Sequence, residues 1–122
     1  MISLKNKMMM FTYLNEENLD QSDVYIQTTL PVYITLSTIP SRAENTFKLI
    51  RHMLKKVHGV EKIILNIPNQ YHRFPNAKID LSRGEDLLQN NKFILNRTND
   101  YGPLTQCMPA LSLIPDESIR IV

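Results

Sequence analysis

The sequence predicts an α/β fold with three layers, in which helices flank a mainly parallel sheet of about four strands. Short runs of β-branched and apolar residues alternate along the chain with segments of helical periodicity. One of these runs, 61–67, is apolar almost without interruption, as expected for a strand that is buried on both faces of a parallel sheet. With 122 residues, the chain has room for one domain.

The first 28 residues are predicted to be a weakly structured extension that precedes the domain at 29–122. Residues 15–23 are polar and acidic and show no sustained apolar period. The uncharged run 8–14 is far shorter than the ~20 apolar residues that a membrane-spanning helix needs. No small-residue cleavage site follows this run. We therefore expect no membrane span and a cytoplasmic location.

The first strand is expected at 32–38, where β-branched and aromatic residues predominate. A proline ends it, and Ser41 and Glu44 then have the spacing of a capping box. Apolar residues at helical spacing predict an amphipathic helix over about 42–57. Gly59 follows where a left-handed C-terminal cap belongs.

The second strand, at 61–67, is followed by a predicted loop over 68–81 that contains prolines and asparagines. Ser82 and Glu85 repeat the capping-box spacing and predict a short helix that ends near residue 90. The third strand is expected at 92–97, where apolar residues return.

A fourth helical segment and a fourth strand complete the predicted order. Pro103 stands at the first helical position, where proline is favoured because its missing N–H would have no partner there. Pro109 lies inside the segment and predicts a kink or a helix in two pieces. No helix follows the strand at 118–122, so several apolar strand faces are expected to lack cover. We interpret the chain as the front half of a larger α/β domain, or as a split or truncated product of one.

This winding predicts functional loops at 38–42, 66–75 and 98–103, because parallel sheets bind ligands at the carboxyl ends of their strands. The first loop combines hydroxyls, backbone N–H groups at a helix start and one guanidinium, which suit a phosphate or ribose contact. The alternative is a capped turn with a solvated arginine. The candidate nucleotide-binding residues are Thr38, Pro40, Ser41, Arg42, Asp100, Tyr101 and Gly102.

The turn at 100–103 has the most unusual composition in the chain. Asp100 offers a hydrogen-bond acceptor, Tyr101 an aromatic ring that suits stacking on a base, and Gly102 room for a ligand to approach the backbone. The alternative is a tight strand-to-helix turn. The run 71–74 mixes aromatic and cationic side chains and suits either ligand contacts or the attachment of a loop to the body.

Charge and composition exclude several classes of function. A net charge of +2, from 14 Lys+Arg and 12 Asp+Glu, is too small to indicate nucleic-acid binding. One cysteine, Cys107, excludes an internal disulfide framework and a zinc site made of cysteines alone, and a buried, inert thiol is expected. No metal-ligand spacing and no catalytic constellation occurs, so no metal or catalytic residue is expected in this chain.

Residues 34–42 resemble the opening strand and loop of a group of glycosyltransferase-like proteins with the GT-A fold. The segment 100–105 resembles the "DYGP-small-T" string of that group. The spacing between these segments, and the residues that follow the second strand, also match. The matching residues after the second strand are Ile67, Pro68, Tyr71, Arg73, Phe74 and Pro75. The resemblance covers about residues 30–122.

The resemblance implies a nucleotide-sugar-binding domain whose first half holds the nucleotide. In that family the fourth strand runs into an acidic cluster that binds Mn²⁺ or Mg²⁺. This sequence stops at Val122, where the cluster is expected, and has Gln106 where the family usually carries a basic residue. The expected function is therefore that of a nucleotide-sugar-binding half of a glycosyltransferase-like protein, without a cofactor of its own and inactive alone. Whether the chain is an enzyme stays open.

Two other hypotheses remain. The chain is a non-enzymatic remnant or interaction module that pairs through an exposed sheet edge, with itself or with a missing C-terminal half. Alternatively, it is a small nucleotide-binding protein with flavodoxin-like winding. Against the latter, the three glycines form neither a G-x-G-x-x-G pattern nor a Walker pattern.

Overall fold

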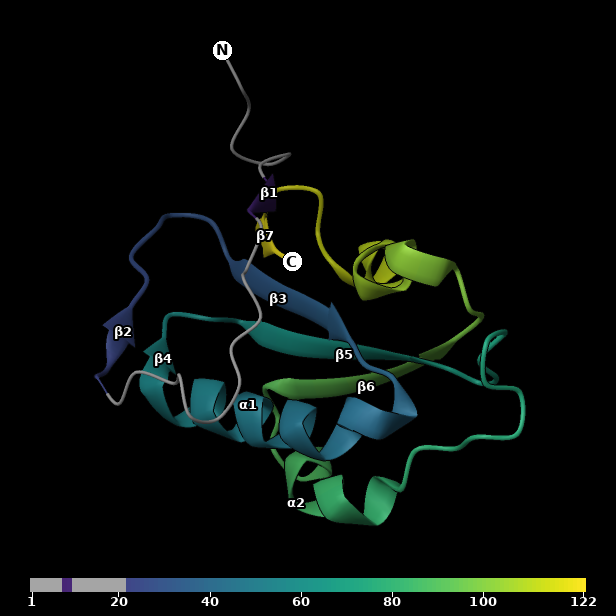
Figure 1. The fold of residues 1–122 in the computed structure, drawn as a ribbon. Coiled ribbons are helices and arrows are strands. Elements are labelled where there is room, and N and C mark those ends of the chain that lie inside the picture. Colours follow the sequence, from purple (N-terminus) through teal and green to yellow (C-terminus); the bar gives the residue numbers. More distant parts are fainter. Residues whose placement is uncertain (1–7, 10–21) are drawn as a thin grey trace.

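A five-stranded parallel sheet organises the protein (Figure 1). The computed structural model describes residues 8–9 and 22–122. The strand order is β1-β7-β3-β5-β6, and each neighbouring pair is parallel. The strands are β1 (Met8–Met9), β3 (Val32–Ser37), β5 (Lys62–Pro68), β6 (Phe93–Thr98) and β7 (Ile119–Ile121). The predicted α/β class with a parallel sheet is confirmed.

Helices lie on both faces of this sheet. Figure 1 shows α1 and α2 on one side and two green-yellow 3₁₀ helices, η5 and η6, on the other. The α-helices are α1 (Ala43–Lys56) and α2 (Glu85–Leu88); the 3₁₀ helices are η3 (Pro40–Arg42), η4 (Leu81–Gly84), η5 (Gly102–Gln106) and η6 (Met108–Leu113). The fourth helical segment is thus in two pieces, as Pro109 predicted, and both pieces have 3₁₀ rather than α geometry.

Neither predicted capping box forms. Ser41 lies inside η3, and no side chain caps either η3 or α1. Because the chain turns into a 3₁₀ helix at Pro40, Ser41 is already past the position that a capping side chain occupies. In the second case the cap is Asp80, whose carboxylate accepts a hydrogen bond from the Ser82 N–H at 3.0 Å. Sequence spacing identified both helix starts within about three residues but assigned the wrong capping residues.

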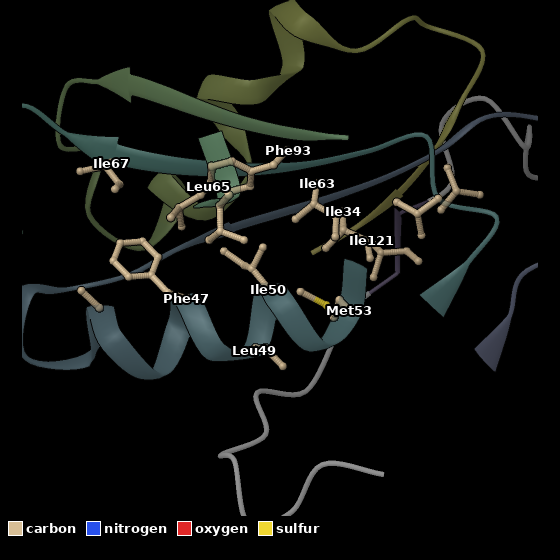
Figure 2. Close-up of a cluster of buried hydrophobic side chains, with 14 residues drawn as sticks. Ile34, Phe47, Leu49, Ile50, Met53, Ile63, Leu65, Ile67, Phe93 and Ile121 are labelled. Carbon is tan, nitrogen blue, oxygen red and sulfur yellow. The ribbon is translucent and has the colours of Figure 1, made fainter. Parts of the chain in front are cut away.

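The main core lies between α1 and the sheet. Figure 2 shows Phe47, Ile50 and Met53 pointing from the helix towards the strands. Ile50 is fully buried, and Ile63 on β5 is 1% exposed. The cluster's buried residues are Val32, Ile34, Ala43, Phe47, Leu49, Ile50, Met53, Val60, Ile63, Leu65, Ile67, Leu87, Phe93 and Ile121.

The opposite face of the sheet has a smaller core. Tyr33 and Ile64 pack there against Ala110 and Ile114, which come from η6 and the residue after it. The expectation of apolar strand faces without cover is therefore wrong for these residues. The segment that holds Pro103 and Pro109 folds back over the sheet, although its 3₁₀ geometry gave no amphipathic period to detect.

A small parallel sheet joins the N-terminal part of the chain to the end of α1. It pairs β2 (Val24–Tyr25) with β4 (Val57–His58). The His58 ring stacks on Tyr25 at 4.7 Å and its Nε2 lies 3.0 Å from Asp23 Oδ1. Most of the predicted extension at 1–28 lies outside the described residues, and its described part contributes β1 and β2, which the sequence did not predict.

Gly59 adopts the left-handed conformation that the sequence predicted, with φ of +94°. It does not cap α1, however, because α1 ends at Lys56 and β4 intervenes. A Cβ atom at this position would lie 2.1 Å from the Ile26 carbonyl oxygen. Gly59 therefore allows the segment after β2 to approach the end of β4.

The order of the strands places a switch point beside β3. The chain moves from β3 to β5 to β6 on one side and then returns to β7 on the other side of β3. Loops after neighbouring strands diverge at such a point, which leaves a crevice at the carboxyl ends. A ligand site is therefore expected at the carboxyl ends of β3 and its neighbours.

Candidate functional site

Two adjoining clefts lie at the carboxyl ends of the central strands. The large cleft has a volume of about 740 Å³ and is bordered by the loops after β3, β5 and β6. Its lining residues are Ser37, Thr38, Ile39, Arg42, Pro68, Tyr71, His72, Arg73, Phe74, Asp100, Gly102, Pro103, Thr105 and Gln106. The small cleft, of about 300 Å³, runs along β3 beside the end of β7. It is lined by Ile34, Thr35, Leu36, Ser37, Thr38, Ile39, Arg42, Thr46, Leu49, Met53, Gln106 and Val122.

In the structure, the predicted loops at 38–42 and 98–103 both border the large cleft. Four of the seven predicted residues line the large cleft, namely Thr38, Arg42, Asp100 and Gly102. The other three, Pro40, Ser41 and Tyr101, are not among its lining residues. The Tyr101 residue is 42% exposed, and the residues with phenyl or phenol rings that line the cleft are Tyr71 and Phe74.

Tyr71 fixes the loop after β5 to the loop after β3. Its side chain is 7% exposed, and its hydroxyl donates a hydrogen bond to the Thr38 carbonyl oxygen at 2.5 Å. Burial raises the pKa of Tyr71 to about 12, and the negative charge of Asp100 adds to the rise. The phenol therefore stays protonated and keeps donating at neutral pH.

Asp100 fixes the same loop to the turn after β6. One carboxylate oxygen accepts a hydrogen bond from the His72 N–H at 2.9 Å, and the other accepts one from the Gly102 N–H at 2.8 Å. These two backbone bonds hold the pKa of Asp100 below its usual range. Asp100 thus sets the distance between the two walls of the large cleft.

Three threonine hydroxyls around the clefts already have protein partners. The Thr38 and Thr46 hydroxyl oxygens are 2.7 Å apart, and the Thr46 hydroxyl donates to the Arg42 carbonyl at 3.0 Å. The Thr105 hydroxyl accepts from the Tyr101 N–H at 2.9 Å. These bonds shape the loops, so a ligand is left to contact other side chains of the lining, among them those of Arg42, His72 and Arg73.

Arg42, His72 and Arg73 all line the large cleft. Among the residues that the structure describes, the Arg42 guanidinium has no ion-pair partner. The Arg73 guanidinium lies over the Phe74 ring, 5.7 Å from its centroid. Arginine presents planar donors that match phosphate and carboxylate oxygens, so this cleft suits an anion.

A buried amide network supports the floor of the cleft. Asn66 on β5 is fully buried, and its Nδ2 donates to the Gln106 carbonyl at 3.3 Å. Asn96 on β6 donates to Asn66 Oδ1 at 2.9 Å and to the Pro109 carbonyl at 3.4 Å. The pair therefore holds η5 and η6 against the sheet at the point where Gln106 enters both clefts.

Sequence reasoning found part of this site. It identified the run 71–74 as a cluster of aromatics and cations and favoured attachment of the loop to the body over ligand contacts. The structure shows that Tyr71 attaches the loop, while His72 and Arg73 line the cleft. Sequence reasoning assigned no role to Asn66, although a polar residue within an apolar strand was a usable signal. No sequence pattern indicated the role of Thr105, because its hydrogen bond with the Tyr101 N–H depends on how the turn folds.

Within residues 8–9 and 22–122, no group of three or more His, Cys, Asp or Glu residues could hold a metal ion. In the same part of the chain, no helix has the length and apolar character needed to cross a membrane.

Lowering the pH is expected to loosen the large cleft through Asp100. Its folded-state pKa is below the ordinary value of about 3.9, so its stabilising bonds are complete above that pH and are lost as the pH falls through the folded-state pKa. Asp100→Asn loses one acceptor and should cost about 1–2 kcal/mol at neutral pH. Urea unfolding between pH 7 and pH 2 measures this, and the difference between wild type and variant should shrink at the acid end. A constant difference would contradict the assignment.

Comparisons with known proteins give one weak similarity. The curated cell division protein FtsP of Histophilus somni (strain 2336) is 27% identical over 118 residues, which covers 89% of this chain and 25% of that protein. The chain thus spans about a quarter of the length of this relative. No family model matches the chain, and no solved structure matches it.

These findings overturn the resemblance to glycosyltransferases of the GT-A fold. The matching curated protein is a cell division protein and not a glycosyltransferase, and neither a family model nor a solved structure supports that fold. The interpretation rested on two short loop motifs and their spacing, and short motifs at the carboxyl ends of parallel strands do not by themselves define a family.

Proposed function

We propose that this protein binds a phosphorylated small molecule, of the size and charge of a nucleoside diphosphate, in the large cleft. The observation that carries the proposal is that Arg42, from the loop after β3, and His72 and Arg73, from the loop after the adjacent parallel strand β5, line one cleft. Ligands of open parallel sheets bind at the carboxyl ends of the strands, where loops from different strands meet. Neither a metal nor a catalytic step is part of the proposal.

Different residues of the cleft suit the phosphate groups and the base of such a ligand. The two guanidinium groups suit the phosphate oxygens, since charge-assisted hydrogen bonds are the strongest that side chains offer, and the His72 ring adds an N–H donor. Phe74 is 37% exposed and lines the cleft, so a planar base can pack against the part of its ring that the Arg73 guanidinium leaves uncovered. Gly102 has a φ of +61°, and a Cβ atom at this position would meet no other heavy atom within 4 Å. The turn therefore leaves room for a ligand beside it.

Isothermal titration of ADP, UDP and inorganic pyrophosphate tests the proposal. Arg42→Ala should weaken binding of at least one of these probes by about tenfold or more, because a charge-assisted hydrogen bond contributes about 1.5–3 kcal/mol. Arg83→Ala is the matched control: it removes the same charge from the exposed helix η4, away from both clefts.

The outcomes separate the proposal from general charge attraction. Equal losses in the Arg42 and Arg83 variants would assign the binding to net charge alone and would refute the site. Absence of heat and of amide shifts with all three probes at millimolar concentration would refute the function itself.

A further inference from the structure

The ionisable side chains that line the large cleft differ in whether their charge changes near neutral pH. They are Arg42, Tyr71, His72, Arg73 and Asp100. Arginine keeps its charge at every pH that proteins tolerate. Burial raises the pKa of Tyr71 to about 12, so the phenol stays neutral, and backbone hydrogen bonds hold the pKa of Asp100 below its usual range, so the carboxylate stays negative. His72 remains, and histidine is the side chain whose charge ordinarily changes between pH 5 and pH 8.

The charged groups around His72 come from three loops. Asp100, in the turn after β6, interacts electrostatically with His72. Arg42 lies in the loop after β3, and Arg73 follows His72 in the loop after β5. The lining residues of η5 carry no ionisable side chain, and Arg97 on β6 interacts with Tyr71 but does not line the cleft.

The fixed charges of the lining nearly cancel. Two arginines and one aspartate leave a single positive charge between pH 5 and pH 8. Protonation of His72 doubles this charge. A change of this size, at residues that border the same cleft, should alter the affinity for an anion.

The position of His72 does not depend on the charge of its ring. Its backbone N–H donates to Asp100 at 2.9 Å, and the adjacent Tyr71 is tied to the Thr38 carbonyl. Both bonds persist across this pH range, because neither Asp100 nor Tyr71 titrates in it. The residue is exposed, and within residues 8–9 and 22–122 its ring forms neither a hydrogen bond nor an ion pair. The ring is therefore available to a ligand in either charge state.

We propose that protonation of His72 regulates the phosphate site, so that the large cleft holds its ligand more tightly in mildly acidic solution than at alkaline pH. This regulation rests on the proposed phosphate-binding function and acts on the same site. A protonated imidazole offers two N–H donors and a positive charge, whereas the neutral ring offers one donor. Because charge-assisted hydrogen bonds are about twice as strong as neutral ones, the affinity should rise about fivefold between pH 8 and pH 5.5.

The test uses a probe whose own charge is constant over this range. A terminal phosphate gains a proton near pH 6, which would change the charge of ADP itself. ADP that is methylated on its terminal phosphate carries one charge on each phosphate at both pH values. Isothermal titration of this methyl ester at pH 8 and at pH 5.5 should give a dissociation constant about fivefold lower in acid.

Three variants assign the effect to one residue. His72→Gln should bind the methyl ester equally at both pH values, because glutamine does not titrate. His72→Lys should also lose the pH dependence, and its permanent charge should give it a higher affinity at pH 8 than His72→Gln. His52→Gln is the matched control: it removes a histidine of α1 that lines neither cleft, and it should keep the pH dependence of the wild type.

Proton uptake gives an independent measurement. Since the ligand favours the protonated ring, binding near pH 6.5 should draw a fraction of a proton from the buffer, and titrations in two buffers of different ionisation enthalpy detect it. His72→Gln should take up none. An equal dissociation constant at both pH values, or a pH dependence that persists in His72→Gln, would overturn the regulation and leave the phosphate site in place. Absence of binding of both ADP and its methyl ester at either pH would instead refute the function on which the regulation rests.

Discussion

Replacing Tyr71 by alanine is expected to lower the free energy of unfolding by about 3–4 kcal/mol and to abolish binding in the large cleft. The ring is 7% exposed and makes an edge-to-face contact with Phe74 at 6.5 Å, while the hydroxyl holds the Thr38 carbonyl. Without it, the loop that carries His72 and Arg73 loses its attachment to β3. Urea denaturation measures the stability, and titration with the phosphate probes measures the binding.

Tyr71→Phe is the matched control, because it keeps the ring and removes only the hydrogen bond. It should cost about 1 kcal/mol and preserve most of the binding. The variant should also lack the loss of stability that is expected of the wild-type protein at alkaline pH. Since burial raises the pKa of Tyr71 to about 12, its contribution is complete below the ordinary value of about 10 and is lost as the pH rises through 12. If alanine were no more harmful than phenylalanine, the ring would not hold the loop.

The strands were predictable from the sequence because their signal is local. The apolar run of β5 and the β-branched run of β3 each indicate a buried strand, and both lie within about two residues of their expected places. The two-residue strands β2 and β4 carry no such pattern. They form because Gly59 lets two distant segments approach, a contact that no short window of sequence contains.

The site was less predictable than the fold, for a similar reason. Arg42 was identified because an arginine at a helix start after a strand has a direct chemical use. Asp100 was expected to offer an acceptor to a ligand, but its two oxygens accept backbone N–H groups from Gly102 and from a residue 28 positions earlier. Whether a polar side chain is free for a ligand depends on such long-range partners, which the sequence alone does not supply.

Asn66→Ala is expected to destabilise the protein by about 2–3 kcal/mol and to weaken phosphate-probe binding at the same time. Asn66 is fully buried, and its loss leaves the Gln106 carbonyl and one donor position of Asn96 without this partner. The residue thus couples the stability of the sheet to the position of η5. Asn91→Ala, an exposed change of the same chemistry, should stay within about 0.5 kcal/mol of wild type.

A double-mutant cycle with Asn96→Ala shows whether the two amides act as a unit. The bond between them predicts that the double variant loses less than the sum of the two single losses, by about 1 kcal/mol. Replacing both asparagines by leucine sharpens the argument. Stability should largely return, because no buried amide is left half-paired, whereas binding should stay weak, because nothing then holds Gln106 at the cleft. Additive losses, or recovery of binding in the leucine pair, would show that the network supports the fold without shaping the site.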